Sequence, residues 1–182
     1  MENKTNLTII TQYYSSKISL IGFYLLGIIL LSVSSKVSIP FFPVPMTLQT
    51  FVVYFIATTM GMIGFYSTLS YLILGLIGLP IFAKGGGFLY YMEPSFGFLI
   101  GMVAASFAIA YLSNSLFNKS IINIIFVSFV GLALVFYFGL VYLAFFIGVE
   151  KAIIFGLKPF IYSELLKIAL AISLTYLLIK KN

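Results

Sequence analysis

The sequence predicts an all-α integral membrane protein, with six transmembrane helices in a single domain over residues 1–182. The first observation is composition, because 62% of the residues are hydrophobic and only 8% are charged. Soluble domains have about 45–50% apolar and about 25% charged residues. The second observation is that the charges leave uncharged stretches long enough to cross a hydrocarbon core of about 30 Å.

The residue types that are missing exclude several functions. All the acidic residues are Glu and all the basic residues are Lys, and the chain has no Asp, Arg, His, Cys or Trp. Common zinc sites, thiol nucleophiles and Ser-His triads are therefore absent, and we expect neither an enzyme nor a metal or cofactor site. The net charge of +6 comes from scattered Lys residues, which is typical of a membrane protein rather than of a nucleic-acid-binding one.

The first helix is predicted over residues 18–35, an uncharged run that follows Lys17. This run is longer than the hydrophobic region of a secretory signal peptide, which has about 7–15 residues, and more hydrophobic spans follow it. We therefore interpret it as a retained helix. A cleaved signal peptide is the alternative, since a Ser-Val-Ser tripeptide near the end of the run loosely resembles a cleavage site.

The next uncharged stretch, residues 37–83, is too long for one crossing. Its first part, SIPFFPVPMT, contains prolines that fix φ and remove backbone donors, so it is not a continuous helix. The remainder predicts two short helices, over residues 47–62 and 64–79, joined by a tight turn at GMIG. A polar, glycine-rich loop, IFAKGGGFLYYMEP, follows them.

Three more helices are predicted over residues 94–112, 121–147 and 159–179, the last beginning at a proline that suits a first helical turn. An even number of crossings places both termini on one side. The distribution of Lys favours the cytoplasm for that side, in a bacterial-type inner membrane. The proline segment, the glycine loop and the start of the last helix then share the outer face, where a substrate pocket can form.

Glu164 and Lys167 are the main candidates for a binding site. They lie one turn apart in the last predicted helix and therefore share a face. A lysine offers a compact cation to an anionic group, and a carboxylate offers acceptors to N–H donors, so the pair suits a small carboxylate with a polar head. The alternative is a self-paired couple in which Lys167 reaches the headgroups, and the two residues alone leave both open.

Two further places are candidates. Lys84 precedes its glycines, so AKGGGF does not match the phosphate-binding pattern Gly-x-x-x-x-Gly-Lys-Ser/Thr. The loop is either a flexible external segment or one that closes over a ligand at Gly85 and Gly86 while Lys84 supplies charge. Gln49, at the start of the second helix, either makes an interhelical hydrogen bond or directs its amide into a pocket beneath the proline segment.

Four segments together resemble the BioY family in their order and spacing: SIPFFPVPMTLQTF, YLILGLIGLPIFAKGGGF, EPSFGFLIG and GLKPFIYSELLK. Members of this family are the biotin-binding S components of energy-coupling-factor (ECF) transporters. The resemblance implies the six-helix ECF S-component fold, biotin as the ligand near the external face, and a transmembrane T component and ATPase subunits as partners. It covers nearly the whole chain.

The resemblance also implies roles for the candidate residues. The family's last helix usually carries Gly-Asp where this chain has Ser163-Glu164, whereas Lys167 matches the family. Glu164 is then expected to accept hydrogen bonds from the ureido ring of biotin, with Gln49 serving the same ring. Either Lys167 or Lys84 is expected to hold the carboxylate.

Other positions depart from the family pattern. Where the family has Pro-(Thr/Ser)-Gly-Gly-Tyr, this chain has PSFGF at residues 94–98. The Ala-x-x-x-Ala pattern of small residues in the family's first helix is also lost, because Leu31 stands four positions after Gly27. Glu164 in place of the family's Asp makes an S component for a different vitamin one alternative. A second alternative, from another class, is a small channel or structural membrane protein in which Glu164 and Lys167 are merely paired. Saturable binding of one vitamin distinguishes transport from the channel.

Overall fold

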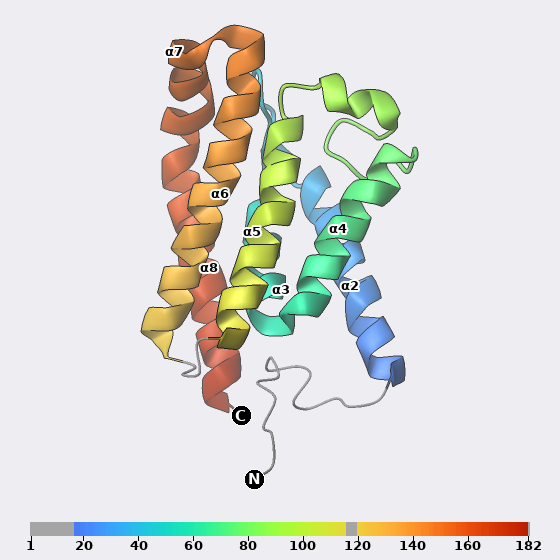
Figure 1. The fold of residues 1–182 in the computed structure, drawn as a ribbon, viewed down its shortest axis with the longest axis vertical. Helices are drawn as coiled ribbons and strands as arrows, with labels where there is room; N and C mark the ends of the chain where they lie inside the picture. Colours follow the sequence, from blue (N-terminus) through green and yellow to red (C-terminus); the bar gives the residue numbers. More distant parts are fainter. Residues whose placement is uncertain (1–16, 116–119, 182) are drawn as a thin grey trace.

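The computed structural model describes residues 17–115 and 120–181, which form a bundle of helices (Figure 1). Its main helices are α2 (Lys17–Lys36), α3 (Gln49–Met60), α4 (Met62–Leu76), α5 (Phe96–Ser115), α6 (Ile121–Ile147) and α8 (Lys158–Lys181). Shorter elements connect them: β1 (Ser38–Ile39), β2 (Met46–Thr47), the 3₁₀ helix η1 (Phe88–Met92), α7 (Val149–Ala152) and the π-helical turn η2 (Ile153–Leu157).

The all-α membrane class predicted from composition is confirmed. Four stretches of helix are long and apolar enough to cross a membrane: α2, α5, α6 and the continuous segment from α7 to α8. The helices α3 and α4 are apolar but shorter, so a count of six crossings stays a prediction. A Gly61 residue with φ +58° separates α3 from α4, as expected for a tight turn at this glycine.

The short helix α3 lies at the centre of the bundle. It contacts α2, α4, α5, α6 and α8, and nearly all of its residues are buried. A helix enclosed on all sides is expected to be apolar all round, yet α3 also carries Gln49, Thr50 and Tyr54 on its buried surface. These polar groups therefore need partners inside the protein.

The connections of the bundle divide between its two ends (Figure 1). The hairpin of β1 and β2, the loop that contains η1, and the α7–η2 segment lie at the upper end, whereas α2 begins and α8 ends at the lower one. The hairpin pairs Ser38 with Thr47 and Ile39 with Met46 in antiparallel register. The proline segment, the glycine loop and the start of α8 thus gather at one end of the molecule.

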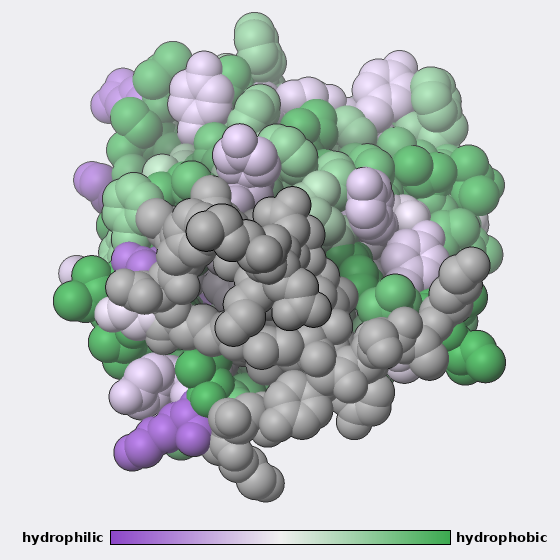
Figure 2. Space-filling view, turned by 60° about the horizontal axis from the view of Figure 1, so that its bottom comes forward, coloured by the Kyte–Doolittle hydropathy of each residue, from purple (hydrophilic) through white to green (hydrophobic). Residues whose placement is uncertain are grey.

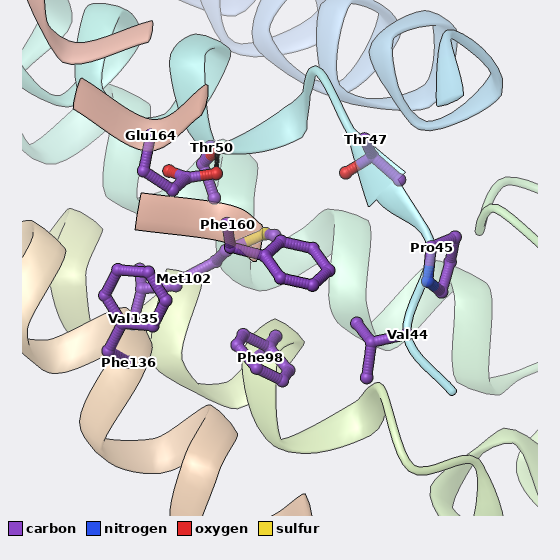
Figure 3. A pocket seen from close by; sticks show the side chains of 10 residues that line it. All are labelled: Val44, Pro45, Thr47, Thr50, Phe98, Met102, Val135, Phe136, Phe160 and Glu164. Carbon is purple, nitrogen blue, oxygen red and sulfur yellow. Dashed lines mark hydrogen bonds between the residues drawn. The ribbon is translucent and has the colours of Figure 1, made fainter. Parts of the chain in front are cut away.

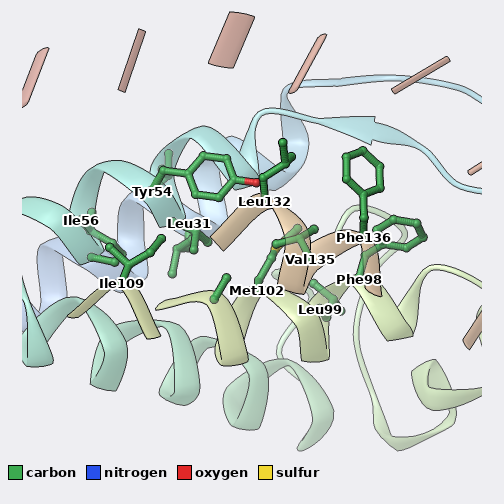
Figure 4. Packing of buried hydrophobic residues seen from close by; sticks show 14 of the residues in the cluster. Leu31, Tyr54, Ile56, Phe98, Leu99, Met102, Ile109, Leu132, Val135 and Phe136 are labelled. Atoms are coloured by element: carbon green, nitrogen blue, oxygen red, sulfur yellow. The ribbon is translucent and has the colours of Figure 1, made fainter. Parts of the chain in front are cut away.

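The hydrophobic core fills the space between α2, α3, α5 and α6. Figure 4 shows Leu31 of α2 and Tyr54 of α3 beside Ile109 of α5 and Val135 of α6, and all four are nearly inaccessible to solvent. Interdigitation of these side chains holds α3 in place.

The outer surface is largely apolar. In Figure 2, which turns the lower end of the molecule toward the viewer, green hydrophobic residues cover much of the coloured surface. On α2 the exposed side chains include Ile18, Ile21, Leu25 and Ile29, which recur every three or four residues and so form one face of the helix. Such a face is matched to lipid tails rather than to water.

The contact between α3 and α4 predicts a stability effect. A Cβ atom at Gly64 of α4 would lie 2.4 Å from the carbonyl oxygen of Ile56 in α3, so Gly64→Ala is expected to force the helices apart and lower the free energy of unfolding by about 1–3 kcal/mol. Thermal unfolding in detergent measures the change. The control is Gly22→Ala on α2, where a Cβ meets nothing within 4 Å. Equal midpoints for the two variants would contradict the tight contact.

Candidate functional site

The Glu164–Lys167 pair lies on the inner face of α8, against α3. The two residues are only 4% and 9% exposed, respectively. The ammonium of Lys167 donates to three oxygen atoms: Glu164 Oε1 at 2.7 Å, the carbonyl of Thr47 at 2.6 Å and Thr50 Oγ1 at 3.3 Å. Because a lysine has three donors, these bonds use all of them. Lys167 therefore points into the protein and does not reach the headgroups.

The carboxylate of Glu164 retains room for another donor. Its Oε1 atom accepts hydrogen bonds from Lys167 and from the Thr50 hydroxyl, the latter at 2.8 Å. Among the described residues, its Oε2 atom accepts only a long bond of 3.4 Å, from the hydroxyl of Tyr54. Since a carboxylate has about four acceptor positions, Oε2 is available to an N–H group of a ligand.

Glu164 forms part of the wall of a cavity of about 360 Å³, its open mouth included. Figure 3 shows Glu164 and Thr50 on one side and Phe98 and Val44 on the other. The residues that line it are mostly apolar or aromatic: Val44, Pro45, Thr47, Thr50, Phe98, Met102, Val135, Phe136, Phe160 and Glu164. A largely apolar pocket with a few convergent polar groups is typical of a site for a small organic molecule.

A second cavity, of about 300 Å³ with its open mouth included, adjoins the first. Both have walls formed by Val44, Pro45, Thr47, Phe98 and Met102. The second is completed by Gln49, Ala83, Tyr90, Ser95 and Leu99. Burial raises the pKa of the Tyr90 hydroxyl, so this group stays protonated and is able to donate a hydrogen bond.

Gln49 makes the interhelical hydrogen bond considered from sequence, and its role in binding a ligand stays a prediction. Its Nε2 donates to the hydroxyl of Tyr71 in α4 at 2.8 Å, and its Oε1 accepts from Thr47 at 3.0 Å. It therefore makes an interhelical hydrogen bond. It also lines the second cavity, beneath the proline segment.

Unlike Gln49, the candidate residues of the glycine loop do not line a cavity. Lys84 pairs with Glu93 at 2.7 Å, and the two side chains are 44% and 36% exposed. Gly85 has φ +122°, and a Cβ at Gly86 would lie 2.0 Å from the carbonyl oxygen of Leu79. The glycines thus allow the loop to turn and to approach the end of α4. None of Lys84, Gly85 and Gly86 is among the residues that line the two cavities, so their role in binding stays a prediction.

Comparison with known proteins assigns the family. The model of the BioY family matches residues 5–181 of this chain. The chain belongs to the BioY family. A probable biotin transporter BioY from Pyrococcus horikoshii is 34% identical over 160 residues, which are 87% of this chain and 93% of the relative. The biotin transporter BioY from Thermotoga maritima is 34% identical over 145 residues, which are 78% and 85% of the two chains.

A solved structure has the same fold. The crystal structure of the S-component for biotin from an ECF-type ABC transporter matches with a TM-score of 0.81, at 23% identity, over 91% of this chain and 93% of that one. The resemblance to BioY and the ECF S-component fold, both expected from sequence motifs, are thus confirmed. Within the described part of this BioY-family chain, no group of three or more carboxylate side chains comes together to hold a metal ion.

Several residues of this BioY site were not predicted. Thr50 and Tyr54 of α3 both contact Glu164, and Thr58, one turn further on, meets Thr175 of α8 at 3.0 Å. The spacing of these α3 residues is a signal that sequence reasoning overlooked, because polar residues four positions apart form one stripe on a helix. The stripe lies along the contact between α3 and α8. Phe98 and Phe160 were missed because aromatic residues are frequent throughout the chain.

Proposed function

We propose that this chain binds biotin in the cavity beside Glu164 and takes it up as the S component of an ECF transporter. The observation that carries the proposal is the carboxylate of Glu164, which is buried in the wall of an apolar cavity and has an acceptor oxygen available. The ligand is inferred from the relatives, which are named biotin transporters, and from the S-component for biotin whose fold the chain shares.

The chemistry of biotin agrees with this cavity. Its ureido ring presents two N–H donors, and Glu164 Oε2 is positioned to accept one of them. Its thiophane ring is apolar and suits a wall that contains Phe98, Phe160 and Met102. Burial of the ring among aromatic side chains supplies affinity, while the carboxylate of Glu164 supplies the orientation.

Transport requires partners, and we propose a transmembrane T component and ATPase subunits. The chain has no Gly-x-x-x-x-Gly-Lys-Ser/Thr sequence, so the energy of ATP hydrolysis has to come from another subunit. We further propose that the protein resides in the cell membrane with both termini in the cytoplasm. In that orientation, the end of the bundle that carries the hairpin and the glycine loop faces outward. Residues of this hairpin line both cavities.

Biotin binding by the purified protein in detergent tests the proposal. Titration calorimetry is expected to show saturable binding of biotin. Prior saturation of the protein with biotin is expected to abolish this binding, whereas prior addition of thiamin or riboflavin is expected to leave it unchanged. Biotin is also expected to stabilise the protein, by about 2.7 kcal/mol at a concentration of 100 times Kd. Displacement by thiamin or riboflavin would instead favour an S component for another vitamin. A folded protein that binds none of the three would contradict the proposal.

A further inference from the structure

The 3₁₀ helix η1 carries a patch of exposed apolar side chains at the upper end of the bundle. Phe88 and Leu89 are each 71% exposed, and Met92 is 56% exposed. No charged residue lies between Lys84 and Glu93 in the sequence. An exposed apolar patch of this kind marks a surface that contacts another protein or a membrane, so η1 is expected to be covered by one of them.

One side chain of η1 points inward and fixes the segment on the bundle. Tyr90 is 8% exposed, and its ring centre lies 4.6 Å from that of the buried Phe82. Tyr90 also lines the second cavity. Residues three apart lie on the same side of a 3₁₀ helix, so Leu89 and Met92 form one stripe, on a different side from Tyr90. The patch therefore faces outward from a fixed position.

The length of α4 indicates what covers the patch. The 15 residues of α4 extend over about 22 Å, whereas the hydrocarbon core of a membrane is about 30 Å thick. The neighbouring α5, with 20 residues, extends over about 30 Å. Ile73 of α4 and Ile77 directly after it are exposed on one face, so lipid beside this face continues beyond the end of α4. Figure 1 shows η1, in light green, above that end.

We propose that η1 lies in the boundary between headgroups and acyl chains, where its patch completes the hydrophobic surface that α4 leaves short. A lipid partner is favoured over a protein because the patch follows the exposed Ile77 in the chain and because aromatic residues are enriched at membrane interfaces. The exposed Lys84–Glu93 ion pair flanks the segment, as expected beside headgroups. Lipid contact with η1 thereby holds Tyr90 in the wall of the second cavity. This inference depends on the membrane class and not on the ligand.

The test uses tryptophan fluorescence, because the chain contains no Trp and a single introduced one reports its own surroundings. Leu89→Trp and Met92→Trp probe the patch. Ile29→Trp, on the exposed face of α2, is the control for lipid, and Glu150→Trp, on the surface of α7, is the control for water. Each variant is placed in phosphatidylcholine nanodiscs whose acyl chains are brominated either near the headgroups or near the chain ends. Quenching by bromine is compared with quenching by aqueous acrylamide.

Leu89→Trp and Met92→Trp are expected to lose as large a share of their emission to bromine as Ile29→Trp. Bromine near the headgroups is expected to quench the two patch positions more, and bromine near the chain ends to quench Ile29→Trp more. Glu150→Trp is expected to respond mainly to acrylamide. Acrylamide quenching of the patch as strong as that of Glu150→Trp would overturn the inference, because the patch would face water. Protection from both quenchers would also overturn it, because a protein surface, such as a second copy of this chain, would cover the patch.

Bilayer thickness provides a second measurement. In nanodiscs of lipids with shorter acyl chains, α4 alone spans more of the hydrocarbon core, so η1 is expected to emerge from it. Acrylamide quenching of Leu89→Trp is then expected to rise, while that of Ile29→Trp stays unchanged. If quenching of Leu89→Trp were the same in thick and thin bilayers, the inference that η1 compensates for the short α4 would be wrong.

Discussion

Glu164→Gln is expected to weaken biotin binding by about 100-fold, because a hydrogen bond between a charged and a neutral group contributes about 1.5–3 kcal/mol. The substitution keeps the shape of the side chain and its carbonyl acceptor for Lys167. In one orientation of the amide, its NH₂ group takes the place of the oxygen that we assign to the ureido N–H. In the other orientation, the NH₂ group faces the ammonium of Lys167. Either orientation loses an acceptor. Titration calorimetry in detergent measures the change in Kd.

Two controls make the result specific to the carboxylate of Glu164. Glu164→Asp keeps the charge on a shorter side chain, as in the usual family pattern, and is expected to bind biotin within about tenfold of the wild type. Glu150→Gln removes a carboxylate from the exposed surface of α7 and is expected to leave Kd unchanged. If Glu164→Gln bound biotin as tightly as the wild type, the assignment of Glu164 as a ligand contact would be wrong.

Lys167→Met is expected to lower the free energy of unfolding by about 3–5 kcal/mol, because it leaves a buried carboxylate without its cation. The carbonyl of Thr47, which accepts the shortest of the three bonds from Lys167, also loses its donor. Methionine has a similar length, so the effect reports charge more than volume. Equilibrium unfolding in detergent measures it, with Lys84→Met as the control for an exposed ion pair, where a loss of less than about 1 kcal/mol is expected.

The double variant Glu164→Gln, Lys167→Met separates stability from binding. It removes both charges of the buried pair, so it is expected to recover much of the stability that Lys167→Met loses. It is not expected to recover biotin binding, since the acceptor of Glu164 remains absent. Additive losses of stability in the double variant would show that the two side chains act independently, contrary to the 2.7 Å contact.

Much of the fold was predictable because membrane helices are encoded locally. Long uncharged runs, prolines at residues 40–45 and glycines at the α3–α4 turn indicated where helices form and where they end. The shared face of Glu164 and Lys167 followed from helical geometry alone. The structure agrees, since the pair forms an i, i+3 ion pair on α8.

The partners of that pair were not predictable from spacing. Thr50 lies 114 residues from Glu164 in the chain and contacts it only because α3 packs against α8. The direction of Lys167 depends on the carbonyl of Thr47, which lies 120 residues away in the sequence and is brought to it by the hairpin. The candidates in the glycine loop had suitable chemistry, yet Lys84 has its own ionic partner, Glu93, at the surface.

The sequence by itself determined the membrane class, the order of the helices, the family resemblance and the shared helix face of Glu164 and Lys167. Those properties depend on composition and on spacing within single helices. Only the tertiary structure decided that Lys167 is satisfied inside the protein and that Glu164 faces a cavity. These depend on how separate helices and loops pack together, and no single segment encodes that arrangement.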